Sequence, residues 1–256
     1  MPAPRPLLLC LSGLDPTGGA GLQADIETAA ALGAHALGLV TALTVQDTRN
    51  VAEVAPTDAA LLERQLRRLL DDVRPQAIKL GLLGSAAQVP VVGRAIDRCR
   101  VPVVCDPVLR AGGGAELAGA GLVQALREEL LPRLTLLTPN AAEARRLAGT
   151  DALEDCGPRL LRAGCANVLV TGGDEPGTEV VNTWFTAGAA PRHFRWPRLP
   201  ETFHGAGCTL AAAVAALLAG GAALDQAIAQ AQAWTHAALA QAIAVGGGRR
   251  IPWRRP

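Results

Sequence analysis

The sequence predicts an α/β protein whose mostly parallel sheet carries helices on both faces. Short apolar runs that end in Gly, Asp, Asn or Thr alternate along the chain with segments of helical spacing. This alternation is typical of a doubly wound sheet. The chain has 256 residues, of which 50% are hydrophobic and 18% are charged. It is therefore long enough for a substantial core, and we expect a single domain over residues 1–256.

The positions of the elements follow from the spacing of the apolar residues. Strands are expected at residues 7–13, 35–45, 76–84, 101–109, 134–140 and 166–173. Helices are expected at residues 18–33, 58–73, 86–99, 117–131, 141–149, 158–165, 205–219 and 224–244. Two further runs, at 180–187 and 191–199, are predicted to pair as antiparallel strands at an edge of the sheet.

Charge and composition exclude several classes of function. The formal net charge is +1, which gives no reason to expect binding to nucleic acid or to a membrane surface. We interpret the basic end of the chain, at about residues 247–256, as a solvated tail.

The apolar stretch at 210–224 falls short of the roughly 20 residues that span a bilayer, and the N-terminal apolar run is too short for a secretion signal. Six scattered cysteines without a CxxC pair indicate neither a zinc site nor a disulfide framework. We therefore expect a cytoplasmic protein.

A candidate anion site lies in the turn HGAGC at residues 204–208. Ligands of open α/β sheets bind outside the carboxyl ends of the strands. Because the chain lacks GxxxxGK[ST] and GxGxxG, a phosphate site would have to be built without a P-loop or a dinucleotide fingerprint. The turn offers backbone N–H groups at the start of an apolar helix, where glycines let an anion approach. Its residues are Gly205, Ala206, Gly207 and Cys208. The alternative is that the glycines only permit a tight turn.

Two carboxylates, an amide and a thiol near the predicted strand ends are further candidates. Asp106 and Glu143 could hold Mg²⁺, directly or through water, and Asn140 could reach nucleotide phosphates. An equally simple interpretation of Asn140 and Glu143 is a capping box. At a helix N-terminus the pKa of Cys208 would fall below about 8.5, which would make it a base or a nucleophile. It could also be a small core residue.

Gln46 and His204 are ambiguous when each is considered alone. The Gln46 amide both donates and accepts hydrogen bonds, which suits the edge of a heterocycle, but Gln46 could also be an ordinary loop residue. His204 precedes the glycine turn, where a histidine is either structural or an acid or base. The absence of HExxH and GxSxG leaves little support for a hydrolase.

Taken together, six segments spread over nearly the whole chain resemble a known family. They are SGLDPTGGAGLQAD, TALTVQDT, KLGLLG, DPVL, LTPNAAEA and HGAGCTLAAAVAALLAG. In this order they resemble the hydroxymethylpyrimidine/phosphomethylpyrimidine kinases of thiamine synthesis, which belong to the ribokinase superfamily. The resemblance includes Cys208, since many other ribokinase relatives carry Asp at this position.

The resemblance implies a three-layer α/β/α, ribokinase-like fold with antiparallel edge strands, usually dimeric. It implies an enzyme that uses ATP with Mg²⁺ to phosphorylate 4-amino-5-hydroxymethyl-2-methylpyrimidine and then its monophosphate. The pyrimidine pocket would consist of Gly13, Ala20, Asp25, Gln46, Leu82 and Val108, with Gln46 bonded to the aminopyrimidine. The nucleotide and Mg²⁺ side would consist of Asp106, Asn140, Glu143 and Thr171. Residues 205–208 would surround the transferred phosphoryl group.

The chain departs from this family at Thr171, where relatives often carry lysine in KGGH. Either the Thr171 hydroxyl suffices and an arginine supplies the positive charge, or nucleotide affinity is lower. Lys79 is the one lysine of the chain, which indicates a confined ammonium site or chance. Two other functions stay open: pyridoxal kinase activity, because both substrates are flat heterocycles with a hydroxymethyl group, and a pyrimidine sensor without catalysis.

Overall fold

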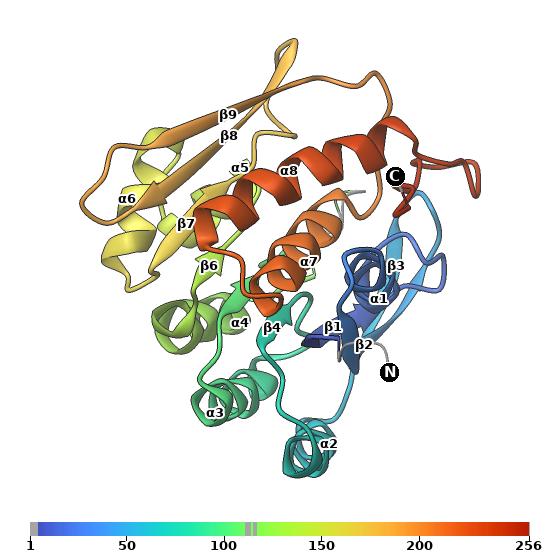
Figure 1. Cartoon of the computed structure of the whole chain (residues 1–256), viewed down its shortest axis with the longest axis vertical. Helices are drawn as coiled ribbons and strands as arrows, with labels where there is room; N and C mark the ends of the chain where they lie inside the picture. The colour runs from blue at the N-terminus through green and yellow to red at the C-terminus, as the bar shows by residue number, and fades with distance from the viewer. Residues whose placement is uncertain (1–4, 111–113, 115–116, 256) are drawn as a thin grey trace.

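The computed structural model describes residues 5–110, 114 and 117–255, and its strands form one nine-stranded sheet (Figure 1). The order in the sheet is β3-β2-β1-β4-β5-β6-β7-β8-β9. The strands are β1 (Leu7–Leu14), β2 (His35–Gln46), β3 (Val51–Pro56), β4 (Ala77–Leu80), β5 (Val103–Cys105), β6 (Leu136–Leu137), β7 (Asn167–Val170), β8 (Glu179–Thr186) and β9 (Arg192–Pro197). Strands β2, β1, β4, β5, β6 and β7 are parallel, whereas β3, β8 and β9 pair antiparallel at the two edges.

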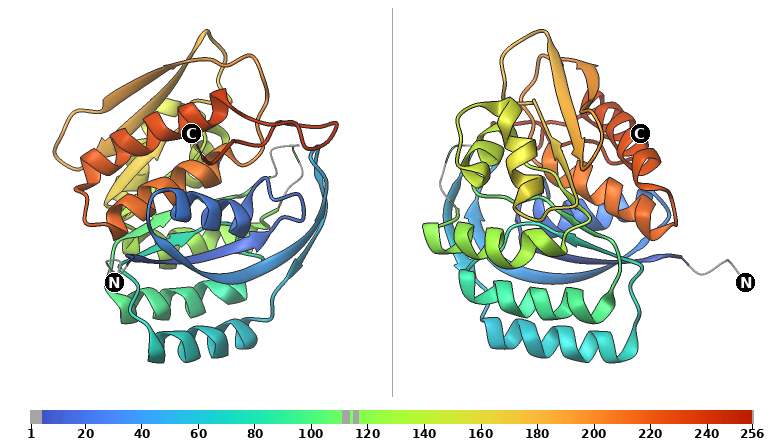
Figure 2. Two further views of the ribbon diagram at one scale, coloured as in Figure 1. Left: turned by 45° about the vertical axis from the view of Figure 1, so that its right-hand side comes forward. Right: turned by 90° about the vertical axis from the view of Figure 1, so that its left-hand side faces the viewer.

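Helices cover both faces of this sheet, so the molecule has three layers (Figure 2). On one face lie α1 (Gly21–Ala31), α7 (Ala206–Ala219) and α8 (Leu224–Ala240). On the other lie α2 (Ala59–Asp72), α3 (Val89–Cys99), α4 (Ala120–Ala125), α5 (Ala141–Ala148) and α6 (Leu153–Arg162). The predicted doubly wound fold is thereby confirmed. No helix in the described part of the chain is long and apolar enough to cross a membrane.

Alternate residues of the central strands face the two layers. In β1, Leu9 and Leu11 belong to the core under α2 and α3, whereas Leu8 and Cys10 belong to the core under α1 and α7. Successive side chains of a strand point to opposite faces, so a strand that is covered on both sides must be apolar throughout. This explains why the central strands are mostly apolar rather than alternating, although β4 also contains the buried Lys79.

The chain order of the strands reverses beside β1, and this creates a crevice for ligands. From β1 the chain continues to β2 and β3 on one side, and then crosses back to β4 on the other side of β1. The connections therefore diverge at the carboxyl ends of β1 and β4. Helix α7, on the face of α1, contacts β1, β4 and β5, and its first residues point toward this end of the sheet.

Strand β3 was not predicted, and α6 begins earlier than expected. Strand β3 is an exposed edge strand that contains Glu53 and ends in Pro56, so its sequence looks like a loop. The spacing of the apolar residues predicted the α6 helix at 158–165. Instead α6 begins at Leu153 and contains Pro158. The segment predicted as a helix at 117–131 combines α4 with a π-helical turn at Leu126–Leu130 and a 3₁₀ turn at Leu131–Arg133.

The expectation of a solvated basic tail is wrong. Arg254 is only 2% exposed, and Nε donates to Thr209 Oγ1 at 3.0 Å, while Nη1 donates to the Gly18 carbonyl at 3.2 Å and to Glu27 Oε2 at 3.0 Å. Ile251 is also buried and exchanges backbone hydrogen bonds with Ile243. The end of the chain therefore folds back over the start of α7. Local charge does not reveal this, because the acceptors for Arg254 come from distant parts of the sequence.

Candidate active site

A cavity of about 280 Å³ lies at the carboxyl ends of the central strands, next to the first turn of α7. Its walls come from segments that follow β1, β2, β4, β5, β6 and β7, and from the turn before α7. This is the crevice that the strand order creates. It lies where the sequence predicts a ligand site, because the carboxyl ends of parallel strands meet at one edge of the sheet.

Nearly all residues singled out in the sequence line this one cavity. From the expected pyrimidine pocket these are Gly13, Ala20, Gln46, Leu82 and Val108. From the expected nucleotide and Mg²⁺ side these are Asp106, Asn140, Glu143 and Thr171. Gly205, Ala206, Gly207 and Cys208 line it as well. Their individual roles stay predictions, but the fold brings them together.

Asp25 is the exception, because its side chain does not line the cavity. It is fully buried, and Lys79 Nζ lies 2.8 Å from Asp25 Oδ1 and 3.0 Å from Oδ2. Ser12 Oγ donates to Asp25 Oδ2 at 2.5 Å and accepts from Lys79 Nζ at 3.1 Å. Asp25 therefore acts as the counter-ion of a buried ammonium rather than as a direct contact of the substrate. A buried charge requires such a partner.

Lys79 occupies a confined ammonium site, one of the two interpretations that the sequence left open. It is fully buried. Burial lowers its pKa, but Asp25 outweighs this effect, and together with Cys208 and Asp106 it holds the pKa well above the ordinary value. Lys79 is therefore a permanent positive charge close to the floor of the cavity, where it compensates the carboxylates around it.

The first turn of α7 has the geometry of an anion site. Gly205 is the N-cap and has φ of 84°, a left-handed conformation that favours glycine. A β-carbon there would overlap the backbone oxygen of Gly19. No side chain of the described residues caps this helix, so the N–H groups of its first turn face the cavity without an intrahelical partner. With the positive end of the helix dipole they would bind a phosphate.

Asp106 and Glu143 form a pair of buried carboxylates, with Asp106 directly beside the first turn of α7 at Gly207. Burial raises the pKa of Glu143 to about 8, and Asp106 contributes to this increase. Glu143 Oε2 accepts from the Asn140 N–H at 3.0 Å, and Asn140 Oδ1 accepts from the Glu143 N–H at 2.9 Å. This is the capping box of α5. The second oxygen, Glu143 Oε1, accepts from Leu109 N–H at 3.2 Å, so the carboxyl group caps the helix and still lines the cavity.

The raised pKa of Glu143 makes the free energy of unfolding of the ligand-free protein depend on pH. The pKa of Glu143 is raised to about 8 on folding, so the folded state holds a proton that the unfolded state releases above about pH 4.5. The stabilisation is complete below the unfolded pKa and is lost as the pH rises through 8. Without divalent cations, we expect the free energy of unfolding to fall by roughly 2 to 5 kcal/mol between pH 4.5 and pH 9. Urea denaturation at several pH values would measure this.

The matched variants are Glu143→Gln and Glu53→Gln. Glutamine keeps the oxygen that caps α5 but removes the titration, so Glu143→Gln should flatten the dependence on pH. Glu53 is exposed on β3, and its replacement should leave the slope unchanged. The assignment fails if both variants keep the slope of the parent protein.

Cys208 differs from the expectation of a reactive thiolate. Burial raises the pKa of Cys208 to about 12; Lys79 opposes this increase, and Asp106 and Asp25 add to it. The thiol is therefore protonated in the free protein, and it lies next to the carboxyl group of Asp106. Sequence reasoning considered only the helix N-terminus, which lowers a thiol pKa. It could not show that the side chain is enclosed between carboxylates.

His204 has a structural partner at the rim of the cavity. His204 Nε2 lies 2.7 Å from Asp15 Oδ2, and Asp15 also accepts from the N–H groups of Thr17 and Ala20, each at 2.8 Å. Burial raises the pKa of Asp15, but the hydrogen bonds from His204 and Thr17 outweigh it and hold the pKa below its ordinary value. This supports the structural interpretation of His204, which joins the turn after β1 to the segment before α7.

A second cavity of about 410 Å³ continues from the first, between α7, α8 and the β8–β9 pair. Its lining includes the apolar Trp196 and Leu210 and the amide Gln232, together with charged residues such as Arg198 and Glu201. Seven residues line both cavities: Thr171, Gly173, Asp174, Phe203, Ala206, Gly207 and Arg249. The start of α7 therefore stands at the border of two connected spaces, as transfer of a group between two bound molecules requires.

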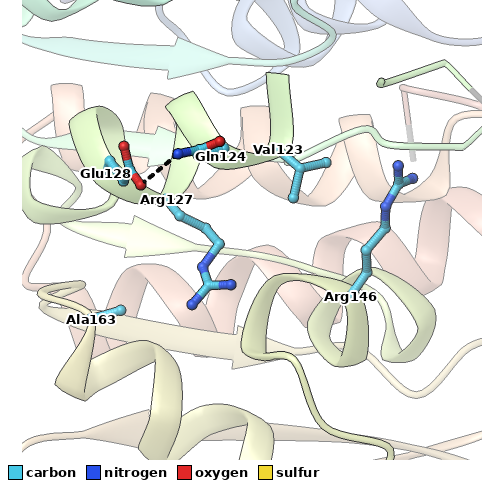
Figure 3. A pocket seen from close by; sticks show the side chains of 6 residues that line it. All are labelled: Val123, Gln124, Arg127, Glu128, Arg146 and Ala163. Carbon is cyan, nitrogen blue, oxygen red and sulfur yellow. Dashed lines mark hydrogen bonds between the residues drawn. The ribbon is translucent and has the colours of Figure 1, made fainter. Parts of the chain in front are cut away.

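A separate hollow lies over α4 and α5, and it contains none of the predicted site residues (Figure 3). Arg127 and Arg146 extend into it, and Gln124 Nε2 donates to Glu128 Oε1 at 3.0 Å. Arg146 also donates to the carbonyl oxygen of Ala118 at 2.7 Å. We assign no function to this hollow.

A family model described as phosphomethylpyrimidine kinase matches residues 15–253. The chain belongs to this family. It is therefore a kinase, and the resemblance found in the sequence is confirmed. The kinase is 36% identical to a hydroxymethylpyrimidine/phosphomethylpyrimidine kinase of Rhizobium meliloti, over 95% of this chain and 94% of that protein. It is 37% identical to the Escherichia coli protein of the same name, over 94% of each.

One longer relative shows that the same unit occurs in a larger protein. The kinase is 39% identical to a thiamine biosynthesis bifunctional protein of Geobacter sulfurreducens, over 96% of this chain but only 52% of that protein. The chain thus spans about half the length of this relative.

Solved structures of similar fold include pyridoxal kinases and a phosphomethylpyrimidine kinase. A pyridoxal kinase from Staphylococcus aureus in complex with AMP-PCP and pyridoxal has a TM-score of 0.89 at 26% identity, over 99% of this chain and 94% of that chain. A phosphomethylpyrimidine kinase from Clostridium difficile has a TM-score of 0.78 at 26% identity, over 91% of this chain and 98% of that one. These neighbours confirm the predicted ribokinase-like fold.

Sequence reasoning missed several residues of the cavity. Asp15 and Asp174 lie in strand-end segments that were recognised, but they were given no role. Thr44, whose Oγ1 accepts from Gln46 Nε2 at 2.8 Å, could have been found from its position two residues before Gln46. Nothing in the sequence pattern indicated a role for Arg249, because it belongs to the segment that we interpreted as a tail.

Proposed function

We propose that this kinase transfers the terminal phosphate of ATP to the hydroxymethyl group of 4-amino-5-hydroxymethyl-2-methylpyrimidine, and then to the resulting monophosphate, in thiamine biosynthesis. The observation that carries the proposal is the single cavity in which Gln46, Asp106 and Cys208 meet the start of α7. The names of the relatives with 36% and 37% identity support this substrate. The AMP-PCP and ADP complexes of the structural neighbours support ATP as the donor.

The two cavities provide separate places for the two substrates. The smaller one would hold the pyrimidine, with the Gln46 amide near its amino group and Leu82 and Val108 against its flat faces. The larger one would hold the nucleotide base, with the phosphates directed toward α7. Because phosphoryl transfer has a loose transition state, alignment and stabilisation of charge should contribute most of the rate. The backbone N–H groups of residues 206–208 are the main candidates for this stabilisation.

Asp106 and Cys208 suit the removal of the hydroxyl proton. The Cys208 thiol is protonated and lies next to the Asp106 carboxyl group. Burial raises the pKa of Asp106, although Lys79 and Cys208 act against this, so its carboxylate is a better base than an exposed one. In our proposal Cys208 receives the proton of the substrate as its own proton passes to Asp106. The proton thereby leaves the alcohol while the new P–O bond forms.

The residues present also fit Mg²⁺. Asp106 and Glu143 are oxygen donors that burial and mutual repulsion leave under-compensated. Mg²⁺ prefers one or two carboxylates together with waters and substrate phosphates, and the described residues contain no group of three or more acidic, histidine or cysteine side chains that could hold a metal alone. When bound, Mg²⁺ would neutralise phosphate charge. Asp106 and Glu143 would hold it through bound water, so that Asp106 keeps an oxygen free to accept the proton from Cys208.

Release of ADP with different acceptors tests the substrate. We expect ADP with the pyrimidine alcohol and with its monophosphate, and slower release with pyridoxal. Pyridoxal kinase activity is the second candidate, because several solved neighbours with TM-scores of 0.89 to 0.90 are pyridoxal kinases. Faster release with pyridoxal would favour this second candidate. Binding of the pyrimidine without any ADP would favour a sensor.

We propose further that the kinase is a cytoplasmic homodimer, which the family resemblance implies. Leu43 and Val45 are alternate residues of β2 and are 53% and 58% exposed. They form an apolar surface that a second copy could cover. Light scattering would measure the mass, and a monomer at micromolar concentration would contradict the dimer.

A further inference from the structure

The border between the two cavities carries one positive charge that no motif predicts. Of the described residues that line both cavities, Arg249 is the only basic one, and Asp174 is the only acidic one. Ala206 and Gly207, from the first turn of α7, lie at the same border. Arg249 therefore lies where a phosphoryl group would pass from the nucleotide cavity to the alcohol.

The backbone around Arg249 is held by contacts from distant segments. The Arg249 N–H donates to the Thr48 carbonyl at 2.9 Å, and the Gly248 N–H donates to Thr48 Oγ1 at 3.0 Å. A β-carbon at Gly248 would overlap the backbone of Thr48, so glycine permits this close approach. The neighbouring Arg250 N–H donates to the Thr202 carbonyl at 3.0 Å. These bonds join the end of the chain to the β2–β3 turn and to the segment before α7.

The guanidinium group itself is only partly compensated. Its Nη2 donates to the Arg49 carbonyl at 3.3 Å, a long hydrogen bond. Partial burial lowers the pKa of Arg249, and Asp174 acts in the opposite direction. Since arginine stays charged at any relevant pH, the group is a partly desolvated cation that faces a phosphate path. Guanidinium groups bind phosphate oxygens with charge-assisted hydrogen bonds.

We propose that Arg249 supplies the positive charge for the terminal phosphate of the bound nucleotide. The resemblance leads one to expect a lysine at position 171, but Thr171, which lines the same two cavities, is uncharged. Arg249 fills this deficit from a different part of the chain. The inference rests on the proposed function as far as ATP is the donor, and it does not depend on which alcohol is phosphorylated.

Nucleotide binding tests this assignment without any acceptor. In calorimetric titrations with Mg²⁺, Arg249→Met should weaken the binding of AMP-PCP by about 10- to 100-fold, while the binding of ADP changes little. Methionine keeps most of the aliphatic stem. Arg250→Met is the matched control, because Arg250 is the adjacent arginine, is exposed and lines neither cavity. It should bind both nucleotides as the parent protein does.

A relocated charge provides the second test. The double variant Arg249→Met with Thr171→Lys places an ammonium group at another position that lines both cavities. We expect it to recover much of the lost AMP-PCP affinity and of kcat, with the KM of the alcohol unchanged throughout. Equal unfolding temperatures of all variants would show that none of them is misfolded.

The outcomes separate this inference from the proposed function. Equal losses of ADP and AMP-PCP affinity in Arg249→Met, or no loss beyond that of Arg250→Met, would overturn the role of Arg249. The parent protein could bind AMP-PCP with the predicted dependence on Arg249 and still phosphorylate no pyrimidine alcohol. This result would refute only the proposed substrate. Failure of the parent protein to bind AMP-PCP would refute both.

Discussion

Replacement of Lys79 by methionine should lower the free energy of unfolding by about 3 to 5 kcal/mol. The substitution leaves the Asp25 carboxylate fully buried without its ammonium partner at 2.8 Å. Ser12 alone would remain to donate to Asp25. An uncompensated buried charge costs much more than the net contribution of the ion pair. Urea denaturation monitored by tryptophan fluorescence would measure the loss at neutral pH.

Two controls identify the cause of this loss. Arg94→Met breaks an ion pair with Glu63 whose two side chains are more than 50% exposed, and it should cost at most about 1 kcal/mol. The double variant Lys79→Met with Asp25→Asn removes both buried charges and should be more stable than Lys79→Met alone. If the double variant is no more stable, loss of packing rather than loss of charge compensation explains the effect.

Replacement of Cys208 by alanine should leave the fold intact and reduce turnover by about 10² to 10⁴-fold. The side chain is small and lies at the first turn of α7, where alanine is a good helix former. Its loss removes the thiol between the alcohol and Asp106, and with it the path of the proton. Steady-state kinetics with a fixed concentration of ATP would give kcat, and the unfolding temperature would confirm that the protein is folded.

The serine variant refines this result. Cys208→Ser keeps an O–H group that can bond to Asp106, so its kcat should lie between those of the parent protein and the alanine variant. Asp106→Asn should lose at least as much as Cys208→Ala, because it removes the final proton acceptor. Near-full activity of Cys208→Ala would remove the thiol from the catalytic role and leave the N–H groups of α7 as the main source of rate enhancement.

The amino-acid sequence by itself determined the layered fold and the place of the site. Strands β1, β4 and β5 are mostly apolar because they are covered on both faces, with Lys79 of β4 as the charged exception. This local property is readable without coordinates. The glycine turn before α7 and the polar residues after the strands also follow from local rules, since the carboxyl ends of parallel strands converge. The edge strand β3 was missed because an exposed edge carries little apolar signal.

The tertiary structure alone decided which charges meet. It placed Asp25 on Lys79, 54 residues away in the chain, and so turned an expected substrate contact into a counter-ion. It enclosed Cys208 and raised its pKa to about 12, opposite to the effect of the helix N-terminus. It also folded Arg249 and Arg254 back onto the site and its surroundings. Two charged groups interact when they lie close in space. Their separation along the chain does not reveal that distance.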